Sequence, residues 1–548
     1  MIDVNLLFVF LTALAVSMLL IPLLMSWAER FRIVDRPGAR KIHAAPVPRI
    51  GGIAFAVGVW TTLLLWAPHD DFIRVYLLAS AVILGFGIWD DRGGLDYRVK
   101  FFGQLLAAVI AVWYGGVTLQ TLPFMEGTEL PGWLAMPLTV VLLVGVTNAV
   151  NLSDGLDGLA GGLSLLTFGG VAYLAYLSGS QTILLLAVAM LGGILGFLRF
   201  NTYPARIFMG DAGSQFLGFT AGVAAWMLVN VGEGLSPTPL IALLLLGLPL
   251  LDTLGVILQR VAGGRSPFLP DSNHIHHKLL KAGFFHHEAV SIIYTLQAGM
   301  VGLAYLFEWQ SDRVVLLVYA AIALPVLASF WLADRWRWRR PDREQSASVA
   351  VMRRLKRRWG AETPVQLLGA SVLLFLLLGV FVPQQVPVDF GVVAIGLFAL
   401  LSSGALLFRR ATPWLVRLGL YVGGAFMIYL ADQSAGSGAA AGWHMPALLN
   451  LLFGLMAVLV VVSIRLSRNE PFQITPLDYL MVLAVLTVPN LPEVQVGGFS
   501  LGTMAAKIIV LFFAYELILS RLSQRMRQYG LAALWVFLAL GIRSWVNL

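Results

Sequence analysis

The segment "NAVNLSDGLDGLAGG" (residues 148–162) lies between two apolar runs, "MPLTVVLLVGVT" (136–147) and "LSLLTFGGVAYLAYL" (163–177). With its flanking residues, each run approaches the roughly 20 residues that an α-helix needs to cross a bilayer. An ionisable side chain at membrane depth costs about 2.5–3.5 kcal/mol. The aspartates and asparagines between the runs therefore predict that two membrane helices meet at a functional polar site.

The composition of the whole chain supports this reading. Of its 548 residues, 59% are hydrophobic and only 12% are charged, whereas soluble domains carry about 45–50% apolar and about 25% charged residues. The chain has no cysteine, which excludes disulfides and thiolate metal sites. The first apolar run, Val4–Trp27, is too long for a signal peptide, so we expect a retained first span. The predicted fold is an all-α polytopic integral membrane protein.

The length rule places about eleven spans in the first part of the chain and about seven in the C-terminal part. The first group is expected near 4–27, 50–67, 74–90, 100–114, 133–152, 158–177, 181–198, 214–231, 237–258, 289–307 and 313–332. The second group is expected near 364–382, 388–407, 414–431, 445–465, 475–490, 501–519 and 530–546.

Basic residues alternate between the predicted loops. The loops at 29–49 and 333–360 are rich in Lys and Arg, whereas the loops on the opposite side are nearly free of both. Because basic loops stay in the cytoplasm, the pattern predicts a cytoplasmic basic side and an outside N-terminus. The organisation expected is a core at 1–332, a basic cytoplasmic linker at 333–363 and a C-terminal transmembrane region of unknown role at 364–548.

The C-terminal region has no paired acids and no histidine cluster. Lys507 lies inside a predicted span, where it needs either to snorkel or to find a buried partner. Arg543 lies near the end of the last span and is expected to snorkel. One reading of the region is a stabilising or oligomerising module, which allows a homodimer. The other is a module that binds a downstream glycosyltransferase, a flippase or a lipid.

Four polar segments fall at the predicted cytoplasmic ends of spans, and this topology predicts that they share one membrane face. They are "GIWDDRGGLDYRVKFFGQ" (87–104), "NAVNLSDGLDG" (148–158), "RFNTYPARIFMGDAGS" (199–214) and "GRSPFLPDSNHIHHKLL" (264–280). Their convergence is stronger evidence for a site than any one of the motifs.

Three of the carboxylates, Asp90, Asp91 and Asp211, have no equal number of bases nearby in the sequence. Like-charged carboxylates that share a site usually hold a cation. Oxygen ligands without cysteine favour Mg²⁺ or Mn²⁺, and Mg²⁺ is typically shared with substrate phosphates. The alternatives are a solvated helix end for Asp90 and Asp91, and a helix cap for Asp211.

The segment around Asp154 and Asp157 repeats a three-residue spacing, as Asn148 and Asn151 do. Residues three apart share a helix face, and the glycines between them allow close backbone approach. The alternative is a glycine-rich helix-packing segment, which would not need the two acids.

The segment "HIHH" supplies three imidazoles, His274, His276 and His277. A zinc site is one reading, although no cysteine or HExxH partner is present; binding to a phosphate or a sugar hydroxyl is the other. Further positive charge for a diphosphate comes from Lys100, Arg206 and Arg265.

These motifs resemble, in order, those of the polyprenyl-phosphate N-acetylhexosamine-1-phosphate transferases. The matching pieces are "HAAPVPRIGG", "DDRGGLDYRVKFFGQ", "NAVNLSDGLDGLAGG", "FMGDAGSQFLGF" and "PDSNHIHHKLL". The resemblance covers about the first 330 residues. The family includes enzymes that start peptidoglycan, O-antigen and teichoic acid lipid intermediates. It implies transfer of a sugar 1-phosphate from a UDP-N-acetylhexosamine to undecaprenyl phosphate in a bacterial inner membrane, with release of UMP.

The resemblance also implies roles for residues. Asp211 would be the Mg²⁺ ligand with Asp90 and Asp91 beside it, and Asp90 is the proposed base or lipid-phosphate partner. The second acidic pair, Asp154 and Asp157, would border the nucleotide and metal. The remaining candidates are nucleotide, phosphate and sugar contacts: Lys100, Asn148, Asn151, Phe208 (on uracil), Arg265, His274, His276 and His277.

The histidine pattern resembles that of the N-acetylglucosamine branch, so the donor expected is UDP-N-acetylglucosamine. The expected partners are this donor, undecaprenyl phosphate and membrane lipid, with no nucleic acid. Two alternatives stay open: the phospho-MurNAc-pentapeptide transferase of peptidoglycan synthesis, and a non-enzymatic membrane transporter. A transporter would place its acids near the midplane rather than at one face.

Overall fold

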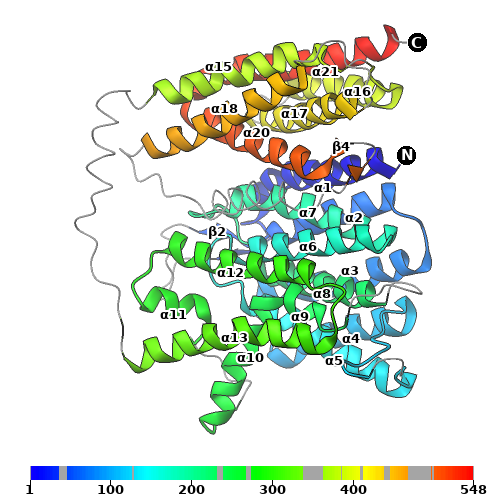
Figure 1. Cartoon of the computed structure of the whole chain (residues 1–548), viewed down its shortest axis with the longest axis vertical. Helices are drawn as coiled ribbons and strands as arrows, with labels where there is room; N and C mark the ends of the chain where they lie inside the picture. The colour runs from blue at the N-terminus through cyan, green and yellow to red at the C-terminus, as the bar shows by residue number, and fades with distance from the viewer. Residues whose placement is uncertain are drawn as a thin grey trace. The chain divides into compact units, whose positions relative to one another are not determined.

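The computed structural model describes most of the chain (Figure 1). The residues not described are 1, 32, 36–45, 126–128, 231–237, 267–272, 337, 339–361, 384, 408–411, 437–444, 467–494, 497–498 and 547–548. The chain divides into two compact units, one comprising Met1–Pro341 and Thr475–Leu477, the other Asp342–Ile474 and Asp478–Leu548. Most of the expected basic linker, and the expected span at 475–490, lie outside the described residues.

The first unit consists of helices and one short hairpin. Its elements are α1 (Ile2–Trp27), β1 (Val34–Asp35), β2 (Val47–Pro48), α2 (Gly51–Trp66), α3 (Asp71–Gly93), α4 (Tyr97–Gly115), α5 (Gly132–Leu152), α6 (Leu159–Leu177), α7 (Gln181–Asn201), α8 (Gly210–Val229), α9 (Ile241–Leu245), α10 (Gly247–Ala262), α11 (Ile275–Lys281), α12 (His286–Leu306) and α13 (Asp312–Arg335). The two strands pair antiparallel.

The expectation of an all-α membrane protein is confirmed. Twelve of the helices in the described part of the chain are long and apolar enough to cross a membrane, and α2 is a shorter apolar helix. The expected ninth span (237–258) differs in detail, because it is divided into α9 and α10 at Leu246. The apolar run alone could not reveal this break, since hydropathy does not report the backbone angles of one residue.

Helix α8 forms the centre of the first unit. It contacts α2, α3, α5, α6, α7 and α9, and nearly all its residues are buried. Its small residues allow this, because membrane helices approach most closely where side chains are small. A Cβ on Gly52 of α2 would lie 2.3 Å from the Cα of Gly213, and a Cβ on Gly87 of α3 would lie 2.3 Å from the Cα of Ala212.

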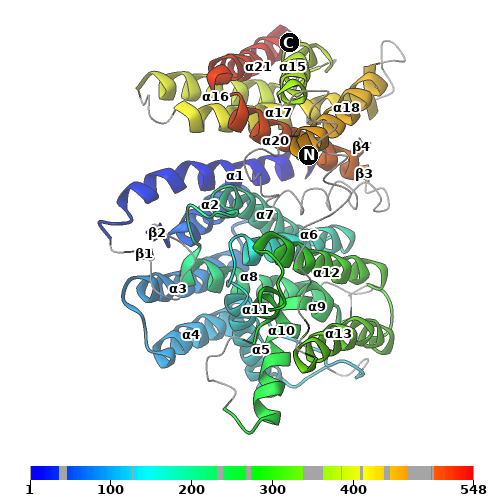
Figure 2. The same cartoon turned by 90° about the vertical axis from the view of Figure 1, so that its left-hand side faces the viewer.

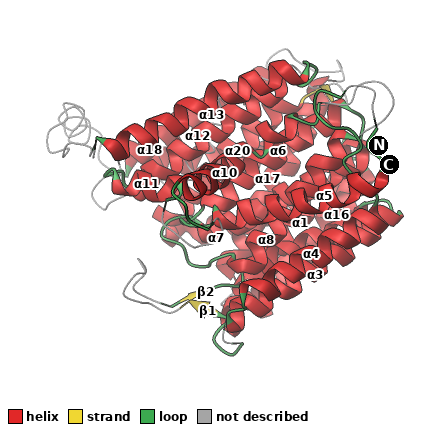
Figure 3. Ribbon diagram, turned by 90° about the horizontal axis from the view of Figure 1, so that it is seen from below, coloured by secondary structure: helices red, strands yellow, loops and turns green. Residues whose placement is uncertain are grey.

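Two groups of helices surround α8. Helices α3 and α5 pack against it, and α4 also contacts α5. Helix α4 lies beside α3, as the view from below shows (Figure 3). Helix α1 runs along α2 and α7 (Figure 2). The first group carries polar side chains at its ends, so α8 and this group build the candidate site.

The turn between α3 and α4 is short and strongly capped. Gly94 has a φ of +66°, which favours glycine because it lacks a Cβ. Asp96 caps α4 by accepting a hydrogen bond from the backbone N–H of Arg98 at 3.0 Å. The local sequence "DDRGGLD" therefore ends one helix and starts the next within a few residues, and its acids stay beside the start of α4.

The second unit is also helical. Its elements are α15 (Thr363–Leu378), η1 (Gly379–Phe381), α16 (Val388–Leu407), α17 (Thr412–Gly436), α18 (Met445–Leu466), β3 (Gln495–Val496), β4 (Phe499–Ser500), α20 (Leu501–Arg521), η3 (Ser523–Arg525) and α21 (Met526–Val546). Strands β3 and β4 pair antiparallel.

Charged side chains inside the second unit have partners. Lys507 on α20 forms an ion pair with Asp432 on α17. Its charge is therefore balanced by a buried partner. Arg543, which we expected to snorkel, instead donates to the backbone carbonyls of Val380 and Pro383. The reason is that the turn after α15 presents carbonyls that no helix uses.

Candidate active site

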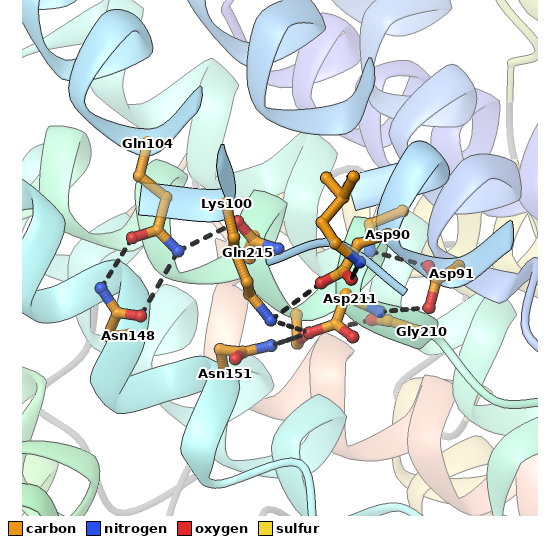
Figure 4. Close-up of polar contacts among 12 residues, drawn as sticks. Asp90, Asp91, Lys100, Gln104, Asn148, Asn151, Gly210, Asp211 and Gln215 are labelled. Atoms are coloured by element: carbon orange, nitrogen blue, oxygen red, sulfur yellow. Dashed lines mark hydrogen bonds and ion pairs between the residues drawn. The ribbon is translucent and has the colours of Figure 1, made fainter. Parts of the chain in front are cut away.

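The centre of the candidate site is an ammonium group held between two carboxylates (Figure 4). The Nζ of Lys100, at the start of α4, lies 3.2 Å from Oδ2 of Asp90 at the end of α3. The same Nζ forms a short ion pair with Oδ1 of Asp211 in the first turn of α8. The structure thus brings together three residues that lie up to 121 positions apart in sequence (90 to 211).

Asp91 has a different surrounding from its neighbour. Its two oxygens accept hydrogen bonds from the backbone N–H groups of Asp211 at 2.8 Å and Ala212 at 2.9 Å. These N–H groups belong to the first turn of α8, where an anion is favourable because they have no partner within the helix. Gly210 makes the approach feasible, since its φ is +70° and a Cβ there would lie 2.3 Å from Oδ2 of Asp91.

Asn151 joins the same centre from the end of α5. Its Nδ2 donates to Oδ1 of Asp211 at 2.8 Å and contacts Oγ of Ser214 at 2.6 Å. Oδ1 of Asp211 therefore receives both Lys100 and Asn151. Among the described residues, the other oxygen of Asp211 accepts no hydrogen bond, which leaves it open to a ligand.

The described residues contain no group of three or more His, Asp or Glu side chains that could hold a metal ion. They do offer carboxylate oxygens of Asp90 and Asp211 around one point, whereas both oxygens of Asp91 are engaged by backbone. Mg²⁺ is typically bound by one or two carboxylates together with substrate phosphates and water. This donor set fits such a shared site, and the assignment of Asp90, Asp91 and Asp211 as ligands stays a prediction.

The loop between α5 and α6 contains the second acidic pair. Oδ2 of Asp157 accepts a hydrogen bond from the backbone N–H of Ala205 at 2.9 Å, which ties this loop to the one before α8. Gly158 is held from both sides: its N–H donates to Asn201 Oδ1 at 3.0 Å, and its carbonyl accepts from Tyr294 Oη at 2.6 Å. Asp157 is thus engaged in the structure of the loop.

Asp154 lies at the other end of this loop. Its side chain is exposed and interacts electrostatically with the carboxylates of Asp211 and Asp91. Its carboxylate has no hydrogen-bond partner among the described residues. The role of Asp154 beside the nucleotide and the metal stays a prediction.

The histidine segment approaches the loop between α5 and α6. His276 is buried, and a Cβ on Gly155 would lie 2.2 Å from its Nε2. Burial, with the charge of His277 next, lowers the pKa of His276 to about 3. His276 is therefore neutral near pH 7, and its ring lies 4.2 Å from that of His277, centroid to centroid.

Sequence reasoning missed Asp252, a buried carboxylate on α10. Its Oδ2 lies 3.0 Å from Nδ1 of His274, and its Oδ1 accepts the backbone N–H of Ile275 at 2.9 Å. The contact directs Nε2 of His274 away from Asp252 and fixes the start of α11. A signal was present, because a single acid inside an apolar helix usually has a specific partner.

The segment "PVPRIGG" holds the loop that precedes Asp211. The backbone N–H of Phe208 donates to the carbonyl of Pro48 at 2.8 Å, and its carbonyl accepts from Gly51 at 2.9 Å. Phe208 is half-buried at this place. Its proposed stacking on uracil stays a prediction, whereas its backbone aligns the start of α8.

Two predicted basic residues do not join the centre. Arg265 and Arg206 have exposed side chains, and neither contacts the carboxylates of Asp90 or Asp211 in the described residues. Asn148 lies beneath the centre, where its Nδ2 donates to Oε1 of Gln104 at 2.7 Å. Of the predicted basic residues, Lys100 is therefore the one that contacts both carboxylates.

Comparison with known proteins identifies the family of the chain. Residues 73–229, which include most of α3 and the whole of α4, α5 and α8, match the family model described as glycosyl transferase family 4. A Bacillus subtilis protein named a probable undecaprenyl-phosphate N-acetylglucosaminyl 1-phosphate transferase is 36% identical over 289 residues, which are 52% of this chain and 80% of that protein.

Two further relatives extend the comparison. An undecaprenyl-phosphate alpha-N-acetylglucosaminyl 1-phosphate transferase of Yersinia pestis is 31% identical over 326 residues, 57% of this chain and 87% of its own length. A decaprenyl-phosphate N-acetylglucosaminephosphotransferase of Mycolicibacterium smegmatis is 33% identical over 335 residues, 55% of this chain and 82% of its own. Because these relatives are more than 30% identical to the chain and are matched over about four fifths or more of their own length, the chain belongs to glycosyl transferase family 4.

Proposed function

We propose that this protein transfers N-acetylglucosamine 1-phosphate from UDP-N-acetylglucosamine to undecaprenyl phosphate, releases UMP and so starts a cell-envelope polysaccharide. The observation that carries the proposal is the Lys100 ammonium between the carboxylates of Asp90 and Asp211 at the ends of membrane helices. The names of the similar proteins from Bacillus subtilis and Yersinia pestis support the same donor sugar and lipid.

The reaction needs charge neutralisation more than covalent chemistry from the protein. An oxygen of the lipid phosphate attacks the sugar-bearing phosphorus of the donor. A new diphosphate bond forms, the bond to the uridine-bearing phosphate breaks, and UMP leaves with the electron pair. Lys100 is positioned to stabilise the negative charge on these phosphates, and Asn151 orients Asp211 beside it.

We propose Mg²⁺ as the cofactor, with Mn²⁺ as its substitute. The residues that would hold it are Asp211 and Asp90, with Asp91 supporting the backbone behind them. When bound, the ion would neutralise diphosphate charge. Before substrate arrives, Lys100 balances the charge of the two carboxylates, and its long flexible stem lets the ammonium move onto a phosphate.

The donor is water-soluble and the acceptor has a membrane-embedded tail, so the reaction belongs at a membrane surface. We propose that this surface is the cytoplasmic leaflet of a bacterial inner membrane, with the N-terminus outside. The basic loops at 29–49 and 333–360 support this orientation. Cysteine substitutions tested with an impermeant thiol reagent would check it, because the chain has no cysteine of its own.

A direct assay tests the activity. The purified protein is mixed with undecaprenyl phosphate, Mg²⁺ and a panel of radiolabelled UDP-sugars, including UDP-MurNAc-pentapeptide, and UMP release is measured. We expect turnover with UDP-N-acetylglucosamine and loss of it in Asp211→Asn. The matched control is Asp71→Asn at the opposite end of α3, where the side chain is 91% exposed. Turnover with only the pentapeptide donor, or with no donor, contradicts the proposal.

A further inference from the structure

Three amide side chains lie about one helical turn from the ammonium–carboxylate centre; we call Gln104, Asn148 and Gln215 the amide layer (Figure 4). Asn148 is half-buried. Gln104 and Gln215 are each 1% exposed. Nδ2 of Asn148 donates to Oε1 of Gln104 at 2.7 Å, and Nε2 of Gln104 donates to Oε1 of Gln215 at 3.0 Å. A longer contact of 3.4 Å joins Nε2 of Gln104 to Oδ1 of Asn148. The layer therefore links α4, α5 and α8 through Gln104.

The amide layer copies the arrangement of the centre above it. On α4, Gln104 comes four residues after Lys100, and on α8, Gln215 comes four residues after Asp211. On α5, Asn148 comes three residues before Asn151. Side chains three or four residues apart lie on one helix face, about one turn from each other. The same faces of the same three helices thus carry both layers.

Packing alone does not explain these amides. Elsewhere on α8, small residues make the close contacts, as at Gly218, where a Cβ would lie 2.8 Å from the Cα of Thr147 on α5. An amide in apolar surroundings is costly unless it is paired, and Nε2 of Gln215 has no hydrogen-bond partner among the described residues. Directional hydrogen bonds, unlike contacts between small residues, fix the rotation and the height of each helix relative to the others.

We propose that the amide layer positions Lys100 and Asn151 on Asp211 for the transfer reaction, with Gln104 as the principal positioning residue. The inference rests on the proposed function. Lys100 reaches its two carboxylates from the first turn of α4, so a small rotation or slide of α4 moves its ammonium directly. A displacement of about 1 Å in a reacting group can lower a rate by about 100-fold.

The test compares Gln104→Met, which keeps the side-chain length and removes the amide, with a matched control. The control is Tyr76→Phe, which removes a buried interhelical hydrogen bond of 2.9 Å between α3 and Thr220 of α8. Per folded molecule, we expect kcat of Gln104→Met to fall by about 10- to 100-fold, with a much smaller change in KM for UDP-N-acetylglucosamine. Tyr76→Phe should keep its kcat.

Two further measurements separate positioning from simple loss of stability. The double variant Gln104→Asn/Asn148→Gln moves one methylene from one side of the contact to the other, so it should recover part of the activity that Gln104→Asn loses. Independently of turnover, the acylation rate of Lys100 by an amine-reactive reagent is measured by mass spectrometry, with exposed Lys281 as the internal reference. We expect Lys100 to react several-fold faster in Gln104→Met and at the wild-type rate in Tyr76→Phe.

The outcomes are distinct. If folded Gln104→Met keeps both its kcat and its Lys100 acylation rate, the inference is overturned while the proposed function stands. If the unsubstituted protein releases no UMP from any donor, the proposed function fails, and the acylation rate alone decides whether the layer positions Lys100. If Gln104→Met does not fold, Gln104→Asn carries the same comparison, since it keeps an amide at that depth.

Discussion

Replacing Asp91 by asparagine should destabilise the start of α8, because the Asp91 carboxylate holds the backbone there. The carboxylate accepts two backbone N–H groups, from Asp211 at 2.8 Å and from Ala212 at 2.9 Å. The amide of Asp91→Asn keeps one acceptor and turns an NH₂ donor toward the other N–H. One hydrogen bond to a charged group is lost, about 1.5–3 kcal/mol, and so is an anion at a helix N-terminus, about 0.3–1 kcal/mol. The free energy of unfolding should fall by about 2–4 kcal/mol.

The assay is equilibrium unfolding in mixed detergent micelles, with Asp90→Asn as the control on the neighbouring residue. Asp90 accepts a single backbone hydrogen bond, from Leu95 at 2.7 Å, and pairs with Lys100. The asparagine in Asp90→Asn retains an acceptor for that bond, so we expect a smaller loss of stability together with a loss of turnover.

The capping argument also predicts that Gly210→Ala is not tolerated. Its Cβ would lie 2.3 Å from the Asp91 carboxylate, and the φ of +70° is strained for alanine. Equal unfolding free energies for Asp91→Asn and Asp90→Asn, combined with a stable Gly210→Ala, would refute the reasoning. Asp91 would then act on the substrate or a cation rather than on the backbone of α8.

Three further predictions concern packing, protonation and the second unit. Gly87→Ala should lower the free energy of unfolding by about 1–3 kcal/mol, because its Cβ would lie 2.3 Å from the α8 backbone. Gly85→Ala, whose Cβ would have nothing within 4 Å, should be neutral, and thermal unfolding in detergent compares the two variants. Burial lowers the pKa of His276 to about 3, so the folded state holds this ring neutral. The free energy of unfolding is therefore unaffected by this histidine above pH 6.5 and decreases as the pH falls toward 3. At pH 5 the loss is about 2 kcal/mol, and His276→Gln should flatten this part of the unfolding profile. Lys507→Met should destabilise the second unit by about 3–5 kcal/mol because Asp432 is left unpaired, and adding Asp432→Leu should restore most of that; additive losses would contradict the pairing.

Some of the site was accessible from residue types and their spacing. Carboxylates and asparagines at the ends of apolar runs predicted a polar centre, because no other location tolerates them at low cost. Asp90, Lys100, Asn151 and Asp211 do meet in the structure. The alternating basic loops predicted one membrane face for these residues, whereas their contact with one another depends on how the helices pack.

Other parts of the site depend on helix rotation, which periodicity does not define. Adjacent residues point about 100° apart on a helix, so Asp90 turns toward Lys100 while Asp91 turns toward the backbone of α8. In the sequence Asp252 is a single acid in an apolar helix, and only the fold places His274 beside it. Arg265 looked suitable for a phosphate, yet the end of α10 leaves it exposed.

The sequence by itself determined that this protein is a bundle of membrane helices with polar clusters at the helix ends. Apolar runs of one length are stable in lipid, and charged side chains within them are costly. Only the tertiary structure decided which carboxylate pairs with lysine, which one caps α8 and which amides join beneath them. Those partnerships depend on the angle and height at which helices pack, and many amphipathic arrangements of the same spans satisfy the hydrophobic effect equally well.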